Sequence, residues 1–516
     1  MKYDYVIVGG GSAGCVLATR LSEDAGKSVI LLEAGPDYPD YEHLPVDIKD
    51  GNNVWRSAYG PHSWDYRATA TPLQPEPIII PRGRTMGGSS SINGQVLFRG
   101  VPEDYDNWAS EGNDEWSFTN VLPYFRKMET DLDFQGDDFH GNEGPIPVRR
   151  YQRQDWLPTA RLFYDACVGM GLPEDPDQNH PDSNGIAARP LNNIGGVRMS
   201  TSLTYLNLAR HRLNLTVRGN VTVGRVIFDG KRAVCVAAQS NGQDFTMEGD
   251  QILLCGGAVA SPQILLLSGV GPAQHLSELG ISLVHELPGV GQNLRDHPSL
   301  FLLFRGYGDA PDDDAPSIQV GLRFSTPGSA TRADFQITPI LMNSEHRPAS
   351  VAIESTDFHF GFGVGLQNAT SAGELRLAST NPTVQPHLNY DFLSEPYDRE
   401  RTRDALRFAV EISKQPQFKD IIAERISPTD QDLATDDALD AWMLRNVYTQ
   451  HHISGTCKMG PGSDPMAVVD QFGHVHGMEA LRVVDASIMP DVIRANTNAT
   501  AIMIGERIAD WIKEGR

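Results

Sequence analysis

The chain has 516 residues, of which 40% are hydrophobic and 21% are charged, so it holds enough apolar material for a large folded core. Its formal net charge of −23 argues against nucleic acids and anionic membrane surfaces as partners. No apolar run approaches the ~18 residues that a membrane span requires, and the strand-like N-terminus leaves no room for a signal peptide. Five scattered cysteines without C-x-x-C spacing fit a cytoplasmic location and predict no metal site.

The N-terminus carries a dinucleotide-binding pattern. An apolar run over residues 5–8 leads into Gly9-x-Gly11-x-x-Gly14, and a second apolar run ends at Glu33, nineteen residues after Gly14. The first glycine allows a tight turn, the second lets the backbone approach a pyrophosphate, and the third lets helix and strand pack closely. The N–H groups at the start of the following helix favour phosphate binding. Because Glu33 can accept ribose hydroxyls, the pattern indicates FAD or NAD and does not separate them.

The middle of the chain alternates irregular and regular segments. A Pro- and Gly-rich stretch over 36–82 is too irregular for regular elements, and a Gly/Ser cluster follows at 83–94. Apolar runs between turn residues predict strands near 215–217, 221–223, 234–236 and 251–255. A helix is expected next, with Ser261 as its N-cap and Pro262 at its first position.

From residue 301 to 390 the period-two pattern predicts an antiparallel sheet with one face toward a cavity. Phe358, Phe360 and Phe362 alternate as one wall of a substrate cavity would, although plain core packing gives the same pattern. The acidic segment 309–316 is expected to be an exposed loop, either a solvated connection or a lid. A helical region over 396–445 follows, then a last strand at 481–485 and a last helix at 500–513.

Five segments in order resemble the glucose–methanol–choline (GMC) family of flavoprotein oxidoreductases. They are the N-terminal fingerprint, residues 83–93, 257–272 and 288–297, and a C-terminal pair at 452–460 and 484–498. The pattern is most similar to choline-dehydrogenase-like and hydroxymethylfurfural-oxidase-like bacterial members. The resemblance implies FAD as cofactor and an alcohol as substrate. Some relatives attach the flavin through a His where this chain has Ile92, so the expected FAD is non-covalent.

The resemblance also implies the architecture, an α/β plus α+β chain of two interleaved domains. A Rossmann-type FAD-binding domain would comprise 1–155, 195–300 and 446–516, and an antiparallel-sheet substrate domain 156–194 and 301–445. The residues expected at the cofactor are Gly9, Gly11, Ser12, Ala13, Gly14, Glu33, Ala34, Arg84, Gly87, Gly88, Ser89, Asn93, Gly94, Val223, Gly257, Asp485, Ala486, Asn496 and Thr497. For Asp485, a role as a helix N-cap is an equal alternative.

The catalytic expectations rest on His452 and Asn496, which match the family's active-site pair. A neutral imidazole can take a hydroxyl proton near neutral pH, whereas an Asn can only donate a hydrogen bond to the alcohol oxygen. His451 is a rival for the base; in extended backbone the two neighbouring side chains would point to opposite faces. His297, His474 and His476 are expected to be structural or exposed. Gln450 is a candidate lining residue, and its polarity favours an acceptor other than O2.

The sequence thus predicts FAD-dependent oxidation of a primary alcohol to an aldehyde, with hydride transfer to flavin N5 and His452 as base. The electrons would pass to O2 or to another acceptor. Two alternatives stay open within the same fold: a non-redox or light-driven enzyme of the hydroxynitrile lyase or fatty-acid photodecarboxylase type, or a flavin-binding protein without turnover.

Overall fold

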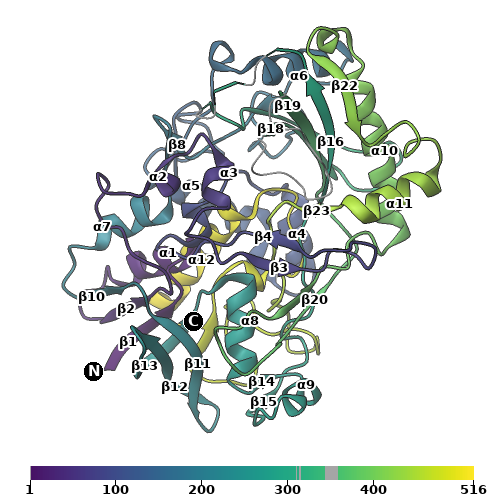
Figure 1. Ribbon diagram of the computed structural model, residues 1–516. Helices are drawn as coiled ribbons and strands as arrows, with labels where there is room; N and C mark the ends of the chain where they lie inside the picture. Colours follow the sequence, from purple (N-terminus) through teal and green to yellow (C-terminus); the bar gives the residue numbers. More distant parts are fainter. Residues whose placement is uncertain (1, 309–310, 313–314, 343–357) are drawn as a thin grey trace.

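The computed structural model describes residues 2–308, 311–312, 315–342 and 358–516, and two seven-stranded sheets organise it (Figure 1). The first sheet has the order β10-β2-β1-β13-β12-β11, with β24 also paired to β13. Its strands are β1 (Lys2–Val8), β2 (Val29–Leu32), β10 (Leu215–Arg218), β11 (Thr222–Asp229), β12 (Arg232–Ser240), β13 (Gln243–Leu254) and β24 (Leu481–Val483).

The first sheet is parallel where the glycine-rich loop leaves it. β1 lies between β2 and β13 and is parallel to both. Its last three residues, Val6, Ile7 and Val8, are buried, as the strand of a sheet covered on both faces should be. The chain then turns through the glycines into helix α1 (Ser12–Leu21).

The first and the last helix of the chain pack against each other beside this sheet. Helix α1 packs against α12 (Thr497–Glu514), the last helix of the chain (Figure 1). The approach is close at Gly505, where a Cβ would lie 3.1 Å from the carbonyl oxygen of Ala13. Arg20 and Glu506 form an ion pair across the contact at 2.8 Å, with the Glu506 carboxylate buried. This packing brings the N-terminal loop and the C-terminal segments to one place.

The second sheet is largely antiparallel and has the order β22-β16-β19-β18-β17-β7, with β23 paired to β16. Its strands are β7 (Gly185–Ala188), β16 (Pro298–Gly306), β17 (Val320–Phe324), β18 (Phe335–Met342), β19 (His359–Leu366), β22 (Ile422–Ser427) and β23 (Tyr448–Thr449). The antiparallel sheet predicted after residue 301 is confirmed.

The remaining elements surround the two sheets. The longer helices are α4 (Pro102–Ser110), α5 (Phe118–Met128), α6 (Pro158–Gly169), α8 (Gly257–Leu267), α10 (Pro396–Ser413) and α11 (Asp436–Asn446). Short helices are α2 (Val46–Lys49), α3 (Val54–Ala58), α7 (Asn207–Ala209) and α9 (Ala273–Glu278). Five two-stranded ribbons pair β3 (Tyr66–Ala68) with β4 (Ile78–Ile80), β5 (Glu129–Asp131) with β6 (Ile146–Val148), β8 (Asn193–Ile194) with β9 (Val197–Arg198), β14 (Val270–Gly271) with β15 (His285–Glu286), and β20 (Glu374–Arg376) with β21 (His387–Asn389). No helix in the described part of the chain is long and apolar enough to cross a membrane.

Several local expectations need correction. Helix α8 begins at Gly257, so Ser261 and Pro262 lie inside it and not at its start. The Ser261 hydroxyl accepts from the Gly256 N–H at 3.0 Å and donates to Asp485 at 2.6 Å. The stretch 36–82 contains α2, α3, β3 and β4, and strand β22 interrupts the helical region predicted over 396–445. Four residues of the acidic segment 309–316 lie outside the described residues, and with them the question of a lid.

Candidate active site

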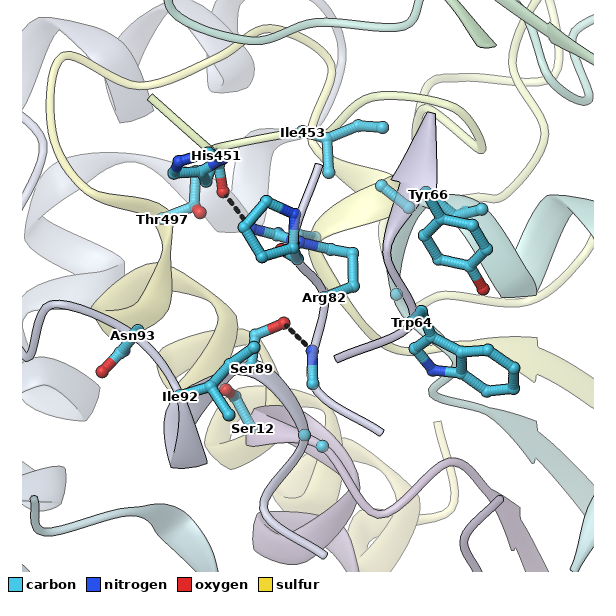
Figure 2. Close-up of a pocket in the computed structure, with 18 of the residues that line it drawn as sticks. Ser12, Trp64, Tyr66, Arg82, Ser89, Ile92, Asn93, His451, Ile453 and Thr497 are labelled. Carbon is cyan, nitrogen blue, oxygen red and sulfur yellow. Dashed lines mark hydrogen bonds between the residues drawn. The ribbon is translucent and has the colours of Figure 1, made fainter. Parts of the chain in front are cut away.

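A cavity of about 630 Å³ runs from the glycine loop after β1 to the segments that follow β23 and precede α12. Residues from the start, the middle and the end of the chain line it, several of them drawn in Figure 2. Of the residues predicted at the cofactor or catalytic site, it brings together Gly9, Gly11, Ser12, Ala13, Glu33, Ala34, Gly88, Ser89, Asn93, Gly94, Val223, Gly257, Gln450, His451, His452, Asp485, Ala486, Asn496 and Thr497.

Six of the predicted site residues do not line this cavity. Gly14 and Gly87 shape the loops behind it, and the Arg84 guanidinium stacks on the Trp64 ring at 4.6 Å. Phe358, Phe360 and Phe362 are buried on the other side of the second sheet, where Phe362 packs against Phe163 and Phe418. Because successive residues of a strand face opposite sides of the sheet, Gly363 lies on the cavity face instead. The phenylalanines are core residues, and the prediction that they form a wall of the cavity is wrong.

The glycine loop has a shape that a dinucleotide fits. A Cβ on Gly14 would lie 1.9 Å from the Gly9 carbonyl oxygen, and one on Gly88 would lie 2.7 Å from the Gly11 Cα. Gly9 and Gly88 also have positive φ angles of +104° and +52°. Helix α1 has no side-chain cap at Gly11, so its first N–H groups are open to the cavity. A close-packed backbone with uncapped helical N–H groups suits the pyrophosphate of FAD.

Glu33, which follows β2, holds the glycine loop after β1 in place. Its two carboxylate oxygens accept hydrogen bonds from the backbone N–H groups of Gly10 and Gly35, each at 2.8 Å. Burial raises the pKa of the Glu33 carboxyl to about 7. Glu33 therefore ties the end of β2 to the glycine loop, and its contact with a ribose stays a prediction.

Asp485 joins α8 to the segment after β24. One oxygen accepts from the Gly257 N–H at 2.9 Å and from the Ser261 hydroxyl, and the other accepts from the Ser487 N–H at 2.8 Å. Burial raises the pKa of its carboxyl. Asp485 is thus the N-cap of the short 3-10 helix Ala486–Ile488 while it also lines the cavity.

A chain of hydrogen bonds fixes the proton positions at His452. The His297 Nε2 lies 2.8 Å from the Ile493 carbonyl oxygen, which can only accept, so this nitrogen carries the proton. The His297 Nδ1 is then an acceptor, and His452 Nδ1–H donates to it at 2.8 Å. The unprotonated Nε2 of His452 faces Asn496, whose Nδ2 donates to it at 2.9 Å. The lone pair that a base needs is therefore on Nε2, where it accepts the hydrogen bond of Asn496.

The surroundings keep these imidazoles neutral. Burial lowers the pKa of His452 well below its usual value, and the neighbouring His297, His451 and Arg82 lower it further. Burial also lowers the pKa of His297 to about 4 and that of His451 to about 3. A neutral imidazole is the form that accepts a proton.

The backbone at His452 is held by Asp296. This buried carboxylate accepts from the His452 backbone N–H at 2.8 Å, the His297 backbone N–H at 2.7 Å and the Thr449 hydroxyl at 2.5 Å. The Arg82 guanidinium donates to the His451 carbonyl at 2.5 Å, as Figure 2 shows. Sequence reasoning missed Asp296 and Arg82, and it expected His297 to be structural or exposed, whereas His297 is buried and contacts His452. Asp296 and His297 lie in the 288–297 segment that carries the family resemblance, which was the available signal.

His451 lies beside the base but makes different contacts. Its φ of +66° shows that the backbone here is not extended, so the expected opposition of neighbouring side chains does not apply. His451 packs edge-on against Tyr448, and its Nδ1 has no hydrogen-bond partner in the described part of the chain. Both histidines line the cavity, but it is His452 that meets Asn496.

The glycine loop at the start of α1 and the neutral His452–Asn496 pair thus share one cavity. The chain belongs to the GMC oxidoreductase family, because two family models described as GMC oxidoreductase match residues 3–299 and 369–505. The family is one of flavin oxidoreductases, and the resemblance drawn from the sequence is confirmed.

Individual relatives cover nearly the whole chain. An oxygen-dependent choline dehydrogenase of Pseudomonas savastanoi pv. phaseolicola is 38% identical over 543 residues, which cover 99% of this chain and 94% of the relative. A GMC-type oxidoreductase of Rhodococcus erythropolis is 38% identical over 520 residues, covering 98% and 97%. The crystal structure of pyridoxine 4-oxidase from Mesorbium loti is similar with a TM-score of 0.92 at 28% identity, over 99% of both chains.

Proposed function

We propose that the protein oxidises a primary alcohol to an aldehyde, with non-covalently bound FAD, His452 as the base and Asn496 as the residue that orients the hydroxyl. One observation carries the proposal. The bond of His297 to the Ile493 carbonyl leaves the unprotonated Nε2 of His452 facing the cavity, next to an N–H donor.

The chain's own residues account for the binding of the cofactor. The backbone at Gly11, Ser12 and Ala13 would hold the pyrophosphate, and Glu33 the adenosine end. Asn93, Ala486 and Thr497 would lie at the flavin end. Ile92 lines the same cavity and offers no nucleophile for a covalent bond, which supports non-covalent FAD. Bound FAD supplies the acceptor for the hydride that leaves the carbinol carbon.

The protein residues manage the proton and the oxygen. His452 takes the hydroxyl proton at Nε2, while its Nδ1–H stays bonded to His297. Asn496 Nδ2–H is the donor available to the substrate oxygen as negative charge develops there. The alcohol thereby loses a proton to His452 and a hydride to the cofactor, and the aldehyde leaves.

Anaerobic titration of the oxidised holoenzyme with choline, aryl, furanic, aliphatic and sugar alcohols tests this proposal. We expect at least one alcohol to bleach the flavin absorbance and to yield its aldehyde. A flavin that stays oxidised with every alcohol would contradict the proposal and favour the lyase, light-driven or non-catalytic alternatives. No feature of the site independently supports those alternatives.

The final electron acceptor is a separate question. Gln450 lines the cavity, and its carboxamide oxygen accepts from Gln367 at 2.8 Å. This polar pair favours an acceptor other than O2. Stopped-flow mixing of the reduced enzyme with air-saturated buffer decides the matter, because reoxidation within seconds would identify an oxidase.

A further inference from the structure

Arg189 is a buried cation that lines the cavity. It follows β7 and is only 2% exposed. Its Nη1 donates to the Gln178 side-chain oxygen at 2.9 Å, and its Nη2 donates to the Thr338 hydroxyl at 2.9 Å. Because a guanidinium has five N–H donors, three of them have no protein partner within the described residues.

No carboxylate in the described part of the chain forms a hydrogen bond or an ion pair with this guanidinium. Its two side-chain partners, Gln178 and Thr338, are both uncharged. Burial lowers the pKa of Arg189 to about 9, the like charge of Arg323 acts in the same direction, and the more distant charge of Asp175 opposes both. The side chain is still a cation at neutral pH. A buried charge without a counter-ion is costly, which points to an anion that enters the cavity.

The second sheet is shaped to hold the guanidinium against the cavity. A Cβ on Gly321 of β17 would lie 2.2 Å from both Nε and Nη2 of Arg189, so the group lies directly on the sheet. Two strands away, Gly365 of β19 makes the same kind of room for Gln450, since a Cβ there would meet the carboxamide. Gly321 and Gly365 are two strands apart and offset by two residues along the strands, which separates them by about 12 Å.

The charges that line the cavity are segregated. Among the described lining residues, the carboxylates are Glu33 and Asp485, both beside the glycine loops of the first sheet. Arg82 and Arg189 are the lining cations. Arg82 donates to the backbone carbonyls of Pro81 and His451, beside the base, whereas Arg189 lies on the second sheet and donates to the uncharged side chains of Gln178 and Thr338. The second sheet therefore presents a cation, and no carboxylate, to the substrate.

We propose that Arg189 binds a carboxylate of the substrate, so that the alcohol oxidised here is a hydroxy acid. Its carboxylate and carbinol carbon are separated by a ring or chain of several atoms, because Arg189 is about two strands from the segment that leads into His452. This inference rests on the proposed alcohol oxidation and adds the substrate class. A guanidinium is suited to the task because it can bind a carboxylate through two parallel N–H bonds.

Matched alcohols test the inference on the wild-type holoenzyme. The first pair is 4-(hydroxymethyl)benzoate and 4-(hydroxymethyl)benzamide; the second is 6-hydroxyhexanoate and 6-hydroxyhexanamide. In at least one pair we expect the acid to exceed the amide in kcat/KM by roughly 10- to 100-fold, as a charge-assisted hydrogen bond implies. Equal values within both pairs would overturn the inference.

Variants and a binding measurement locate the effect at Arg189. In Arg189→Met the preference for the acid should disappear, so that the acid-to-amide ratio of kcat/KM falls to about one. The dissociation constant of 4-methylbenzoate, which cannot be oxidised at a carbinol, should rise in the same variant, measured by its perturbation of the flavin spectrum. Gly321→Ala keeps the charge but places a methyl group against the guanidinium, and it should also reduce the preference.

Arg323→Met is the matched control. Arg323 is equally buried but donates to three backbone carbonyls and does not line the cavity. Its removal should leave the acid-to-amide ratio unchanged. If Arg189→Met loses FAD and not the discrimination, Arg189 belongs to the cofactor and the inference is wrong. If neither acids nor neutral alcohols reduce the flavin, the proposed function fails instead.

Discussion

His452 and His297 meet through their Nδ1 atoms, which lie 2.8 Å apart, and so the base is oriented by a second imidazole and not by a carboxylate. A carboxylate in that place would raise the pKa of the base, whereas a neutral imidazole does not. The pair therefore fixes the tautomer of His452 and leaves it uncharged. Asp296 lies close by, but its carboxylate oxygens accept hydrogen bonds from backbone N–H groups and from the Thr449 hydroxyl.

Replacing His297 by Leu removes the acceptor for His452 Nδ1–H and frees the ring to rotate. We expect the rate of flavin reduction to fall by about 10²-fold, the scale of a misplaced catalytic group, with the substrate dissociation constant little changed. Stopped-flow reduction over a range of alcohol concentrations separates the two quantities. His297→Gln retains an acceptor and should recover part of the rate; no difference between the Leu and Gln variants would argue for a purely structural role.

His452→Ala removes the base itself. The rate of flavin reduction should fall by roughly 10²–10⁴-fold, with FAD still bound. His451→Ala is the matched control, because the neighbouring ring lines the same cavity without contacting Asn496. A larger loss in His451→Ala than in His452→Ala would transfer the role of base to His451.

The acid limb of the pH profile reports the same base. Since the pKa of His452 is lowered below 6.5, chiefly by burial, its protonated and inactive form appears only at pH values well below 6.5. We expect kcat/KM to stay constant from pH 8 down to pH 6 and to fall only in more acidic buffer. A decline centred at or above pH 6.5 is the result that contradicts this assignment.

The sequence was sufficient for the parts of the site whose chemistry is local. The loop from Gly9 to Gly14 has glycine where another part of the backbone comes too close for a Cβ, so the positions of its glycines predict its conformation. The family pattern likewise paired His452 with Asn496, and in the structure the two side chains are in direct contact. In the first case the required residues lie within one short motif, and in the second they lie in two motifs that the family pattern pairs.

Contacts between distant strands could not be predicted in this way. Whether Phe362 or Gly363 faces the cavity depends on which side of the sheet α6 covers, and a period of two is the same for both. The Arg189 guanidinium reaches the cavity because Gly321, on another strand, lies beneath it. Such pairings are set by the register of the sheet, for which a single sequence carries no signal.

The close approach of two glycine loops predicts a selective loss of cofactor. In Gly88→Ala the Cβ would lie 2.7 Å from the Gly11 Cα at a φ of +52°, so the glycine loop that we propose to hold the pyrophosphate must shift. Gly230→Ala has a similar φ of +59° but meets nothing within 4 Å. We expect Gly88→Ala to purify with little FAD and Gly230→Ala to keep a full complement, as read from the flavin-to-protein absorbance ratio. Equal FAD content in both variants would show that the contact is unimportant.

A buried ion network away from the cavity predicts how stability depends on pH. His140 lies at its centre, with Nδ1 2.9 Å from Glu129 and Nε2 2.8 Å from Asp177. Three cations face three carboxylates: Arg99, His140 and Arg150 with Glu129, Asp131 and Asp177. Although burial opposes the charge, bonds to the three carboxylates raise the pKa of His140 to about 10.

This raised pKa determines the sign of the effect. The unfolded chain binds the proton with a pKa near 6.5, so the stability due to the charged His140 is fully present below pH 6.5 and is lost as the pH rises through about 10. We therefore expect the melting temperature of the wild type to fall between pH 7 and pH 10. The substitution His140→Leu should lower the free energy of unfolding by ~3–5 kcal/mol at pH 6, the scale of a broken buried pair. The melting temperature of this variant should fall less steeply with rising pH than that of the wild type. His43→Gln, which breaks an exposed pair with Asp40, is the control and should change neither quantity measurably. Parallel melting curves of the wild type and His140→Leu from pH 6 to pH 10 would show that His140 is not charged in the folded protein.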